Sequence, residues 1–547
     1  MKTILLVSHL LLISIFSFSQ HSRLSLSNDF KFKETGYADQ TISHSIHHND
    51  NFYTVTNDQL RAPKWLFTKL YDVRFSITLS KFDRDMKLLK ELKLENGDEK
   101  FGPLAPQLVF FNNQLVLVYF KNNNASSFNF YLTPVNENDL SLGETKLVST
   151  IQQENLGALK IASFFTAGLA YFTTSQDNTK LLVACKSALN MLHTTIFDEQ
   201  LNIVKQSKTQ VGLKDFEIPS AILTNDNNSL LVLSSEKETR IVGINNEGKK
   251  TERKLQASGN LVPHNTSAMI TRDGKTIYIC SSTNAIEFPG KWSNGMLITQ
   301  LDPSNFKASK AISYEYSQEF IESISKQGGG VKLRKNHFMY GFIPHLLELE
   351  NGSIVVTGSP RDISTNTTMS APDLNNKTRT VSTTTTSTGP VIVFYPEKNG
   401  KTFEHVIVPR RISLSLSSRS GTGPIQIVQS PTATVSNSGY LSKNLGNEIL
   451  IIYSDSESNL MKVEGEKMLT TRKAGDLALA EAFINKDKKL EYRKLVGEKQ
   501  QGGSSYYLNN IVPTSNSSLI FPIGKVTAGI TSFKTKYTNW CFLDITP

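Results

Sequence analysis

The sequence predicts an all-β fold, most specifically a β-propeller of about eight four-stranded blades. Two short repeat units carry this prediction, because they alternate along most of the 547 residues. Each unit combines a polar turn with an apolar or alternating run, which is typical of β-hairpins. Long stretches with helical periodicity are absent, and no segment is typical of a βαβ unit.

The first repeat unit is a short Asn/Asp/Gly turn followed by four or five apolar or β-branched residues. Clear copies are NDNNSLLVLSS (225–235), RDGKTIYICSS (272–282) and ENGSIVVTGS (350–359). Asn-Gly and Asp-Gly favour two-residue hairpin turns, since both central residues need positive φ. The predicted turns of this type fall near Asp50, Asn113, Asn178, Asn227, Gly274, Gly352, Asn447 and Ser517.

The second repeat unit is an apolar strand that enters a polar turn and leaves as an alternating strand. Examples are TTIFDEQLNIVKQ (194–206) and RIVGINNEGKKTERKL (240–255). The turns of this type are expected near Asp83, Asn136, Asp198, Asn246, Asp302, Glu397, Asp487 and Asp544.

The two units interleave strictly, so that each pair encodes two hairpins, or four antiparallel strands A to D. Eight such pairs in one chain predict a propeller that forms a single domain over residues 21–547. The spacing of the repeats is irregular. Seven blades, and a pair of β-sandwiches, therefore remain as alternatives.

The N-terminal segment is expected to complete the last blade. Only three residues follow Asp544, too few for an outer strand, whereas residues 21–43 contain the unassigned alternating stretch LSLSNDFKFKE (24–34). A strand supplied from there removes a free sheet edge, which would otherwise invite aggregation.

One blade unit resembles known propeller repeats. SAMITRDGKTIYICSS (267–282) looks like the repeat of periplasmic Tol-system and prolyl-oligopeptidase propellers, and residues 344–410 resemble uncharacterised exported bacterial propeller-like proteins. The resemblance implies the fold and export, and it carries no catalytic residue to this chain.

Residues 1–20 have the order of a secretory signal peptide. Lys2 is followed by an apolar run from Ile4 to Phe16 and by small polar residues up to Gln20. We therefore expect a cleaved, periplasmic or secreted protein. No later stretch is apolar enough to anchor the chain in a membrane. The mature chain then carries a net charge of +9.

The three cysteines do not form a disulfide framework or a metal motif. Cys185, Cys280 and Cys541 each lie in an apolar run, which indicates buried small hydrophobic residues, although a bridge between two of them remains open.

Four long connections are expected on one face of the propeller. They are residues 317–336, 359–389, 410–440 and 454–476, which follow either strand B or strand D of a blade. The run TVSTTTTSTG (380–389) is interpreted as a low-complexity loop, disordered or glycosylated, GGG (328–330) as a point of motion, and DSES (455–458) as a polar loop.

Positive charge concentrates in the first three of these connections, whose net charge is +6. Loops on a rigid scaffold commonly carry function, and a basic face attracts anionic partners. The alternative is solvated charge without a ligand. The candidate binding residues are Lys326, Lys332, Arg334, Lys335, Arg361, Lys377, Arg379, Arg410, Arg411 and Arg419.

No catalytic or cofactor motif is found, so we expect no metal and no cofactor. The basic loops hold few aromatic residues for base stacking, which argues against nucleic acid. We expect a monomeric binding or scaffold propeller that engages a protein, an anionic glycan or an envelope polymer. The alternative is a glycan hydrolase or lyase with its site at the central channel, because a repeat fold can bring distant carboxylates together.

Overall fold

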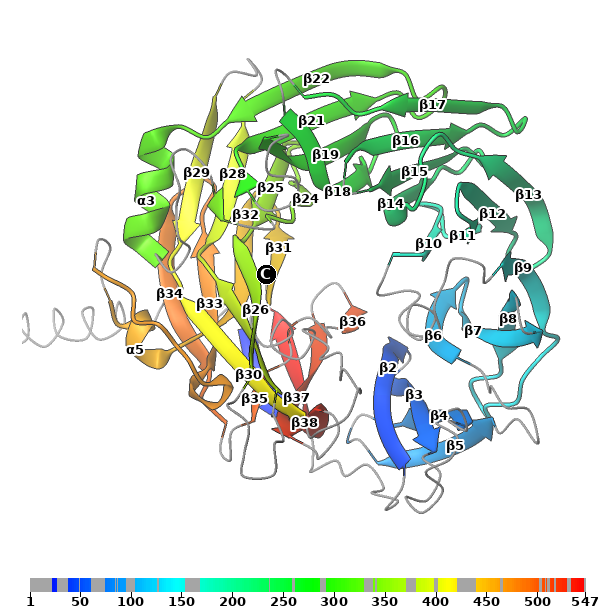
Figure 1. The fold of residues 1–547 in the computed structure, drawn as a ribbon, viewed down its shortest axis with the longest axis horizontal. Helices are drawn as coiled ribbons and strands as arrows, with labels where there is room; N and C mark the ends of the chain where they lie inside the picture. Colours follow the sequence, from blue (N-terminus) through cyan, green and yellow to red (C-terminus); the bar gives the residue numbers. More distant parts are fainter. Residues whose placement is uncertain are drawn as a thin grey trace, which may run out of the picture.

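The computed structural model describes residues 22–26, 38–60, 74–94, 104–152, 168–257, 261–285, 292–328, 338–369, 380–397, 402–420 and 439–545, with short gaps inside several of these ranges. The predicted signal peptide, residues 1–20, lies outside the described residues. Figure 1 shows the small sheets arranged in a ring around a central axis. The fold is an eight-bladed β-propeller.

The first four blades are regular four-stranded antiparallel sheets in which the strands pair in chain order. The strands of blades 1 and 2 are β2 (Ala38–His48), β3 (Asn51–Leu60), β4 (Arg74–Phe82), β5 (Leu88–Leu94), β6 (Leu104–Phe111), β7 (Gln114–Asn124), β8 (Ser127–Val135) and β9 (Lys146–Gln152). Those of blades 3 and 4 are β10 (Ala170–Thr174), β11 (Leu181–Ala188), β12 (Met191–Phe197), β13 (Ile203–Gln210), β14 (Glu217–Leu223), β15 (Ser229–Ser234), β16 (Thr239–Ile244) and β17 (Lys250–Lys254).

Blades 5 to 7 keep the four-stranded pattern and carry additional elements between their strands. Blade 5 consists of β18 (Leu261–Ile270), β19 (Ile277–Ala285), β21 (Gly295–Leu301) and β22 (Ala308–Glu315). Blade 6 consists of β24 (His345–Glu348), β25 (Ile354–Gly358), β28 (Val391–Pro396) and β29 (Phe403–Val408), and blade 7 of β31 (Tyr440–Leu445), β32 (Glu448–Asp455), β33 (Ala478–Ile484) and β34 (Leu490–Gly497).

The eighth sheet is less regular. Its long strands β37 (Ser518–Ala528) and β38 (Phe533–Ile545) pair with each other, and two short strands, β35 (Ser505–Tyr506) and β36 (Val512–Ser515), both pair with β37. The strand β1 (Ser22–Leu26) pairs antiparallel with β38, from Ser22 opposite Ile545 to Leu26 opposite Cys541. Of the stretch 24–34 that we expected in this position, only Leu24 to Leu26 belong to the described residues.

Most of the described turn positions confirm the predicted repeats. The prediction of a turn near Asp544 was wrong, because Asp544 lies inside β38 and pairs with Arg23 and Ser518, and the predicted turn at Ser517 lies outside the described residues. In the A–B turns, φ is positive at Asp50, Asn113, Asn178, Asn227, Gly274 and Gly352, all of them predicted turn residues, and in blade 7 at Gly446, next to the predicted Asn447. Among the C–D turns, φ is positive at Leu140, Leu201 and Phe306. These three side chains are fully or nearly fully buried between blades, so apolar burial offsets a backbone conformation that is unfavourable for bulky residues.

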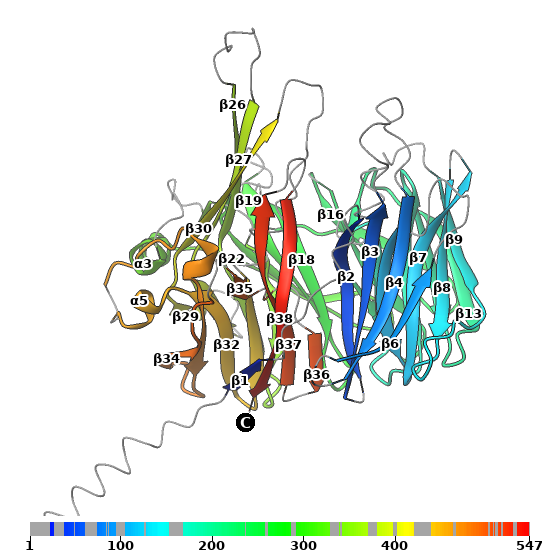
Figure 2. The ribbon, with the colours of Figure 1, turned by 90° about the horizontal axis from the view of Figure 1, so that it is seen from below.

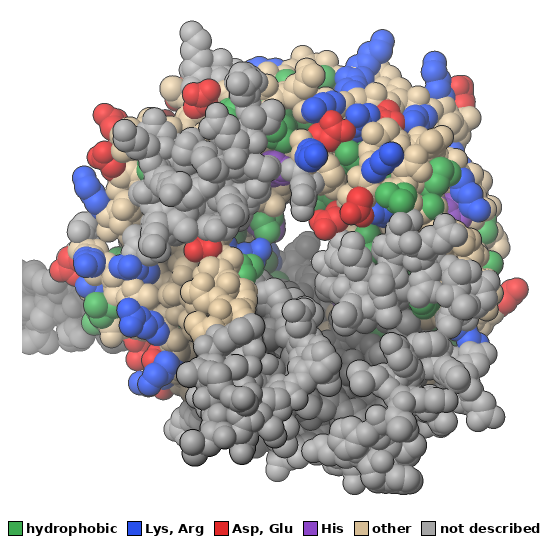
Figure 3. Space-filling view, viewed as in Figure 1, with side chains coloured by type: hydrophobic (Ala, Val, Ile, Leu, Met, Phe, Trp, Pro, Cys, Tyr) green, Lys and Arg blue, Asp and Glu red, His purple; other side chains and the backbone are tan. Residues whose placement is uncertain are grey.

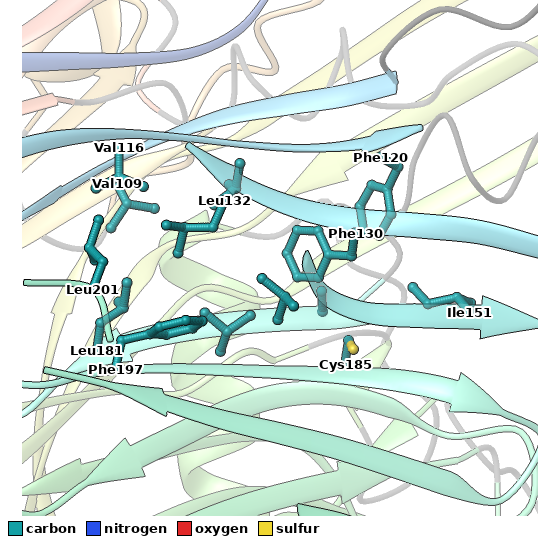
Figure 4. Close-up of a cluster of buried hydrophobic side chains, with 14 of the residues drawn as sticks. Val109, Val116, Phe120, Phe130, Leu132, Ile151, Leu181, Cys185, Phe197 and Leu201 are labelled. Carbon is teal, nitrogen blue, oxygen red and sulfur yellow. The ribbon is translucent and has the colours of Figure 1, made fainter. Parts of the chain in front are cut away.

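The hydrophobic core is divided into clusters that each lie between two consecutive blades. In the cluster between blades 2 and 3 (Figure 4), Phe120 and Phe130 stack at 4.5 Å between ring centroids, and Cys185 and Leu201 join from the next blade. Comparable clusters fill each later interface up to that of blades 7 and 8. Each sheet therefore buries an apolar face against its neighbour.

Lysine side chains reinforce three neighbouring interfaces. The Lys81 ammonium donates to the carbonyl of Glu137 at 2.9 Å, and Lys146 donates to that of Leu201 at 2.6 Å. Lys205 reaches Asn245 in the same way. In each case a lysine of one blade satisfies a carbonyl in the C–D turn of the next.

The three cysteines are free and buried, as expected for small hydrophobic residues. Burial raises the pKa of Cys185 to about 12, with the nearby Ser149 hydroxyl opposing this shift. These thiols are therefore packing groups of the blade interfaces.

We predict that Leu24→Asp destabilises the protein by about 2 kcal/mol, because Leu24 packs against the cluster between blades 7 and 8 and the substitution places a charge there. Urea unfolding of the mature chain measures this free energy. Leu89→Asp, on β5 at a side chain that is 48% exposed, is the matched control and should change it by less than about 0.5 kcal/mol. Equal effects of the two substitutions would contradict a contribution of β1 to stability.

Candidate functional site

The additional elements of blades 5 to 7 all follow strand B or strand D, the two positions at which the chain emerges on the same face of a blade. They are α3 (Gln318–Gly328) after β22, β26 (Arg361–Met369) and β27 (Thr380–Thr388) after β25, β30 (Ile412–Ser420) after β29, and α5 (Glu457–Leu460) with η1 (Ala474–Asp476) after β32. A small sheet of β20 (Trp292–Ser293) and β23 (Phe338–Met339) lies in blade 5's connections. We call this face the insertion face.

Two connections predicted as loops instead form one ordered sheet. β27 is the central strand, and β26 and β30 pair with it antiparallel on either side. At the base of the sheet, Thr388 of β27 lies opposite Arg361 of β26 and opposite Ile412 of β30. We call this three-stranded unit the insertion sheet. Figure 2 shows β26 and β27 projecting above the level of the blades. The interpretation of 380–389 as a low-complexity loop was therefore wrong. Threonine is β-branched and favours strands once partner strands are available.

One side of the insertion sheet is built from hydroxyl and amide side chains and from the carboxylate of Asp362, which lies opposite Ser387. Strand alternation places Ser364 and Asn366 beside Thr383 and Thr385, with Ser415 on the third strand. Thr385 and Ser415 hydroxyls lie 2.8 Å apart, and those of Ser387 and Ser413 lie 3.0 Å apart. Ser364, Asn366 and Ser415 are exposed, so this side offers polar groups to solvent.

The opposite side of the insertion sheet attaches it to blade 7. Ile412 and Leu414 are buried against Leu477, which ends the connection after β32. The backbone of Thr471 also bonds to β30, since its amide donates to Arg411 at 3.0 Å and its carbonyl accepts from Ser413 at 2.8 Å. The sheet is thus held by apolar contact and by main-chain hydrogen bonds at its base.

Arg410 joins the ends of two connections at that base. Its guanidinium donates from Nη2 to the Ser359 hydroxyl, from Nε to the Gly389 carbonyl and from Nη1 to the Gly439 carbonyl, each at 3.0 Å. Ser359 and Gly389 flank β26 and β27, and Arg410 and Gly439 flank the connection that contains β30. The planar guanidinium of Arg410 therefore fixes the ends of the two connections relative to each other.

The prediction that Arg410 is an accessible binding cation was wrong. Its side chain is completely buried and lies 5.7 Å from the ring of Tyr440. Burial lowers the pKa of Arg410 to about 10, while the negative charge of Asp455 opposes this shift. A guanidinium keeps its charge at that value, and its carbonyl partners satisfy it inside the protein.

Asp455 extends the same buried cluster into the third connection. It is the last residue of β32, and its Oδ1 accepts from the Ser456 amide and the Asn459 side chain, both at 2.8 Å. Asn459 in turn bonds to Leu469 through both of its amide atoms. Residues 455–458, which we predicted as a polar loop, instead comprise the end of β32 and the start of α5. Through Asn459, Asp455 links the start of the connection after β32 to Leu469.

Burial raises the pKa of Asp455 to about 7, against the hydrogen bonds from Asn459 and Ser456 and the charges of Arg410 and Arg493. Among the described residues, its Oδ2 has no hydrogen-bond partner. The desolvation of this carboxyl outweighs the attraction of both guanidinium groups.

Among the other predicted cations, the structure describes the side chains of Lys326, Arg361 and Arg411, and these belong to different elements of the face. Lys326 is exposed on α3, whereas Arg361 and Arg411 are half-buried beside the base of the insertion sheet, and burial lowers the pKa of Arg361. Arg419 lies near the end of β30. Lys332, Arg334, Lys335, Lys377 and Arg379 lie outside the described residues. In the described part of this face, Lys and Arg side chains alternate with Asp and Glu (Figure 3).

The connection at 317–336 begins as a helix, which the strand-dominated sequence pattern did not predict. Ser317 accepts from the Phe320 amide at the start of α3. Phe320, Ile321 and Ile324 are buried in the cluster between blades 5 and 6. Gly328, the first residue of the predicted point of motion, ends this helix. The apolar residues occupy one side of three turns, a signal too short to stand out beside the strands.

In the described ranges, no three His, Cys, Asp or Glu side chains come together in a way that could hold a metal ion. The same ranges contain no helix that is long and apolar enough to span a bilayer.

The chain was compared with known proteins. No protein-family model matches it, and no curated protein matches it. Solved structures with a similar arrangement include the WD40 domain of SCAP from fission yeast, at 9% identity over 97% of this chain and 99% of the other, with a TM-score of 0.42. The periplasmic gluconolactonase PpgL of Pseudomonas aeruginosa matches at 11% identity over 74% and 99%, with a TM-score of 0.31.

An α-L-arabinanase of Penicillium chrysogenum, complexed with arabinobiose, matches at 11% identity over 62% of this chain and 93% of the other, with a TM-score of 0.30. These similarities assign no ligand and no reaction to this chain. The fold implied by the resemblance to Tol-system and prolyl-oligopeptidase repeats is present. Membership in those families stays a prediction.

We predict that Arg410→Lys destabilises the protein by about 3 kcal/mol, because one ammonium cannot reach the three acceptors that the guanidinium fork satisfies. Urea unfolding measures the loss, and limited proteolysis should show faster cleavage within 359–440. Lys326→Arg, at an exposed position, is the control and should leave both unchanged. A stability of Arg410→Lys equal to that of the parent chain would show that the buried guanidinium does not hold the insertions.

Proposed function

We propose that this protein is an exported, monomeric binding or scaffold propeller that engages an anionic glycan, an envelope polymer or a protein through its insertion face. The observation that carries the proposal is the insertion sheet. Two separate connections combine into one ordered platform on a single face, and a buried arginine fixes their ends. Ordered elements on a rigid scaffold are a common basis for recognition.

The chemistry of the platform supports a polar ligand. Its exposed side presents hydroxyl groups, which both donate and accept hydrogen bonds, and the amide of Asn366. Arg411 at the base adds positive charge, and we propose that Arg419, which belongs to β30, adds a second positive charge. A polymer that carries hydroxyl and carboxylate or phosphate groups matches this combination.

We predict that Arg411→Glu/Arg419→Glu weakens binding of the mature chain to an anionic polysaccharide, with a loss of about tenfold at low salt that shrinks as salt is added. Retention on heparin-agarose against a salt gradient measures this, with heparin used as the probe. The matched control is Lys208→Glu/Lys249→Glu, which makes the same charge change at exposed positions of blades 3 and 4.

If both double variants lose retention equally, binding follows net charge and not the insertion face. If neither variant loses retention, the role of these arginines is refuted. Replacement of 361–388 by a short Gly-Ser turn then tests the platform itself. Unchanged capture of partners from envelope fractions by that variant would contradict the proposed function.

A further inference from the structure

The connection after β32 is tied to the insertion sheet through a single buried polar cluster. Asp455 holds Asn459, Asn459 holds Leu469, and Thr471 bonds to the backbone of β30 on both sides of Ile412. Arg410 lies within electrostatic range of Asp455 and fixes the remaining ends. Arg410 therefore holds the two connections of blade 6, Asp455 holds the connection after β32, and Thr471 joins that connection to β30.

We propose that Asp455 makes this junction a pH-dependent clasp, which closes the base of the insertion face in mild acid and releases the connection after β32 as the pH rises towards neutrality. The clasp would regulate the insertion face, and only its effect on binding rests on the proposed function. Its geometric basis is the position of Asp455. The carboxyl is fully buried at the exact residue where β32 ends and the connection begins.

The charged and titratable groups around Asp455 come from the neighbouring strands of blade 7 and from Arg410. Arg493 of β34 donates to the carbonyls of Pro409 and Lys462, and its charge, like that of Arg410, attracts the carboxylate. The Arg410 guanidinium, with a pKa lowered by burial to about 10, keeps its charge at neutral pH. Burial raises the pKa of Tyr453 and Tyr440 far above this range. On β33, Glu481 is paired with Lys494 at 3.1 Å.

The sign of the effect follows from hydration. In the closed arrangement the buried carboxyl holds its proton up to about pH 7, whereas the opened connection exposes it to water, where its pKa is near the ordinary value of about 4. The closed form therefore binds the proton more tightly, and acid favours it. Between about pH 5 and 6 a unit of rising pH favours opening by about tenfold, and towards about pH 7 and above the effect levels off because the closed form also ionises.

Hydrogen exchange measured by mass spectrometry on the mature chain, at pH 5, 6, 7 and 8 and corrected for intrinsic rates, tests the clasp without any partner. Segments 456–462 and 466–471 should exchange about tenfold faster at pH 6 than at pH 5, about fivefold faster again at pH 7, and only about twofold faster at pH 8 than at pH 7. Strand β33 in the same blade should show no such trend.

Two variants sharpen the test. Asp455→Asn keeps the shape and the acceptor oxygen towards Asn459 but cannot ionise, so exchange of these segments should lose its pH dependence. Asp476→Asn removes an exposed carboxylate of the same connection and should behave like the parent chain. A pH trend that persists in Asp455→Asn overturns the proposal.

The parent chain alone is also decisive, so the test does not depend on the folding of Asp455→Asn. Exchange of 456–471 that is independent of pH, or that changes together with β33 as in global unfolding, refutes the clasp. A flat exchange profile combined with retention on heparin that depends on Arg411 and Arg419 would refute the clasp and leave the proposed function intact. Exchange that follows the predicted pH trend, combined with retention on heparin that does not depend on Arg411 and Arg419, would refute the proposed role of these arginines and leave the clasp intact.

Discussion

The burial of one small sheet against the next is the interaction on which the rest of this structure depends. A four-stranded sheet has two faces and cannot shield both by itself, so each blade relies on its neighbours. The clusters between blades contain fully buried residues such as Phe130, Val242 and Tyr453. Since every cluster needs side chains from two consecutive blades, the blades stabilise one another, and their ends remain available for insertions that need not contribute to the core.

The insertion face illustrates how such a scaffold supports an element with little core of its own. Within its described part, the insertion sheet buries Ile412 and Leu414 against Leu477, which precedes β33 of blade 7. Its position also depends on main-chain bonds to Thr471 and on the guanidinium of Arg410. A buried charged group is costly unless its partners are complete, and a planar fork with three well-placed acceptors meets that requirement. Polar interactions thus provide the precision here, and apolar packing of the blades provides the stability.

The carboxyl group of Asp455 lies where its ionisation is coupled to the position of the connection after β32. The charges of two guanidinium groups lower the pKa of Asp455, but the removal of water from its carboxyl raises it by more. A charge at the start of this connection couples its arrangement to a single proton. The hydroxyl-rich side of the sheet and the buried junction beneath it are therefore parts of one unit, in which the outer part meets the solvent and the inner part sets its position.

The sequence by itself determined the all-β class, the alternation of two hairpin types and the place of most turns. These features are local: positive φ at Asn178, Asn227 or Gly274 is a property of a few neighbouring residues, and strand alternation needs only a run of them. It also located the long connections. The tertiary structure alone decided that 380–388 is a central strand, that α3 forms, that Arg410 is internal and that Asp455 is buried within its electrostatic range. Each of these depends on partners far apart in the chain, and the environment of a charged or β-branched side chain is set by those partners, which no local pattern contains.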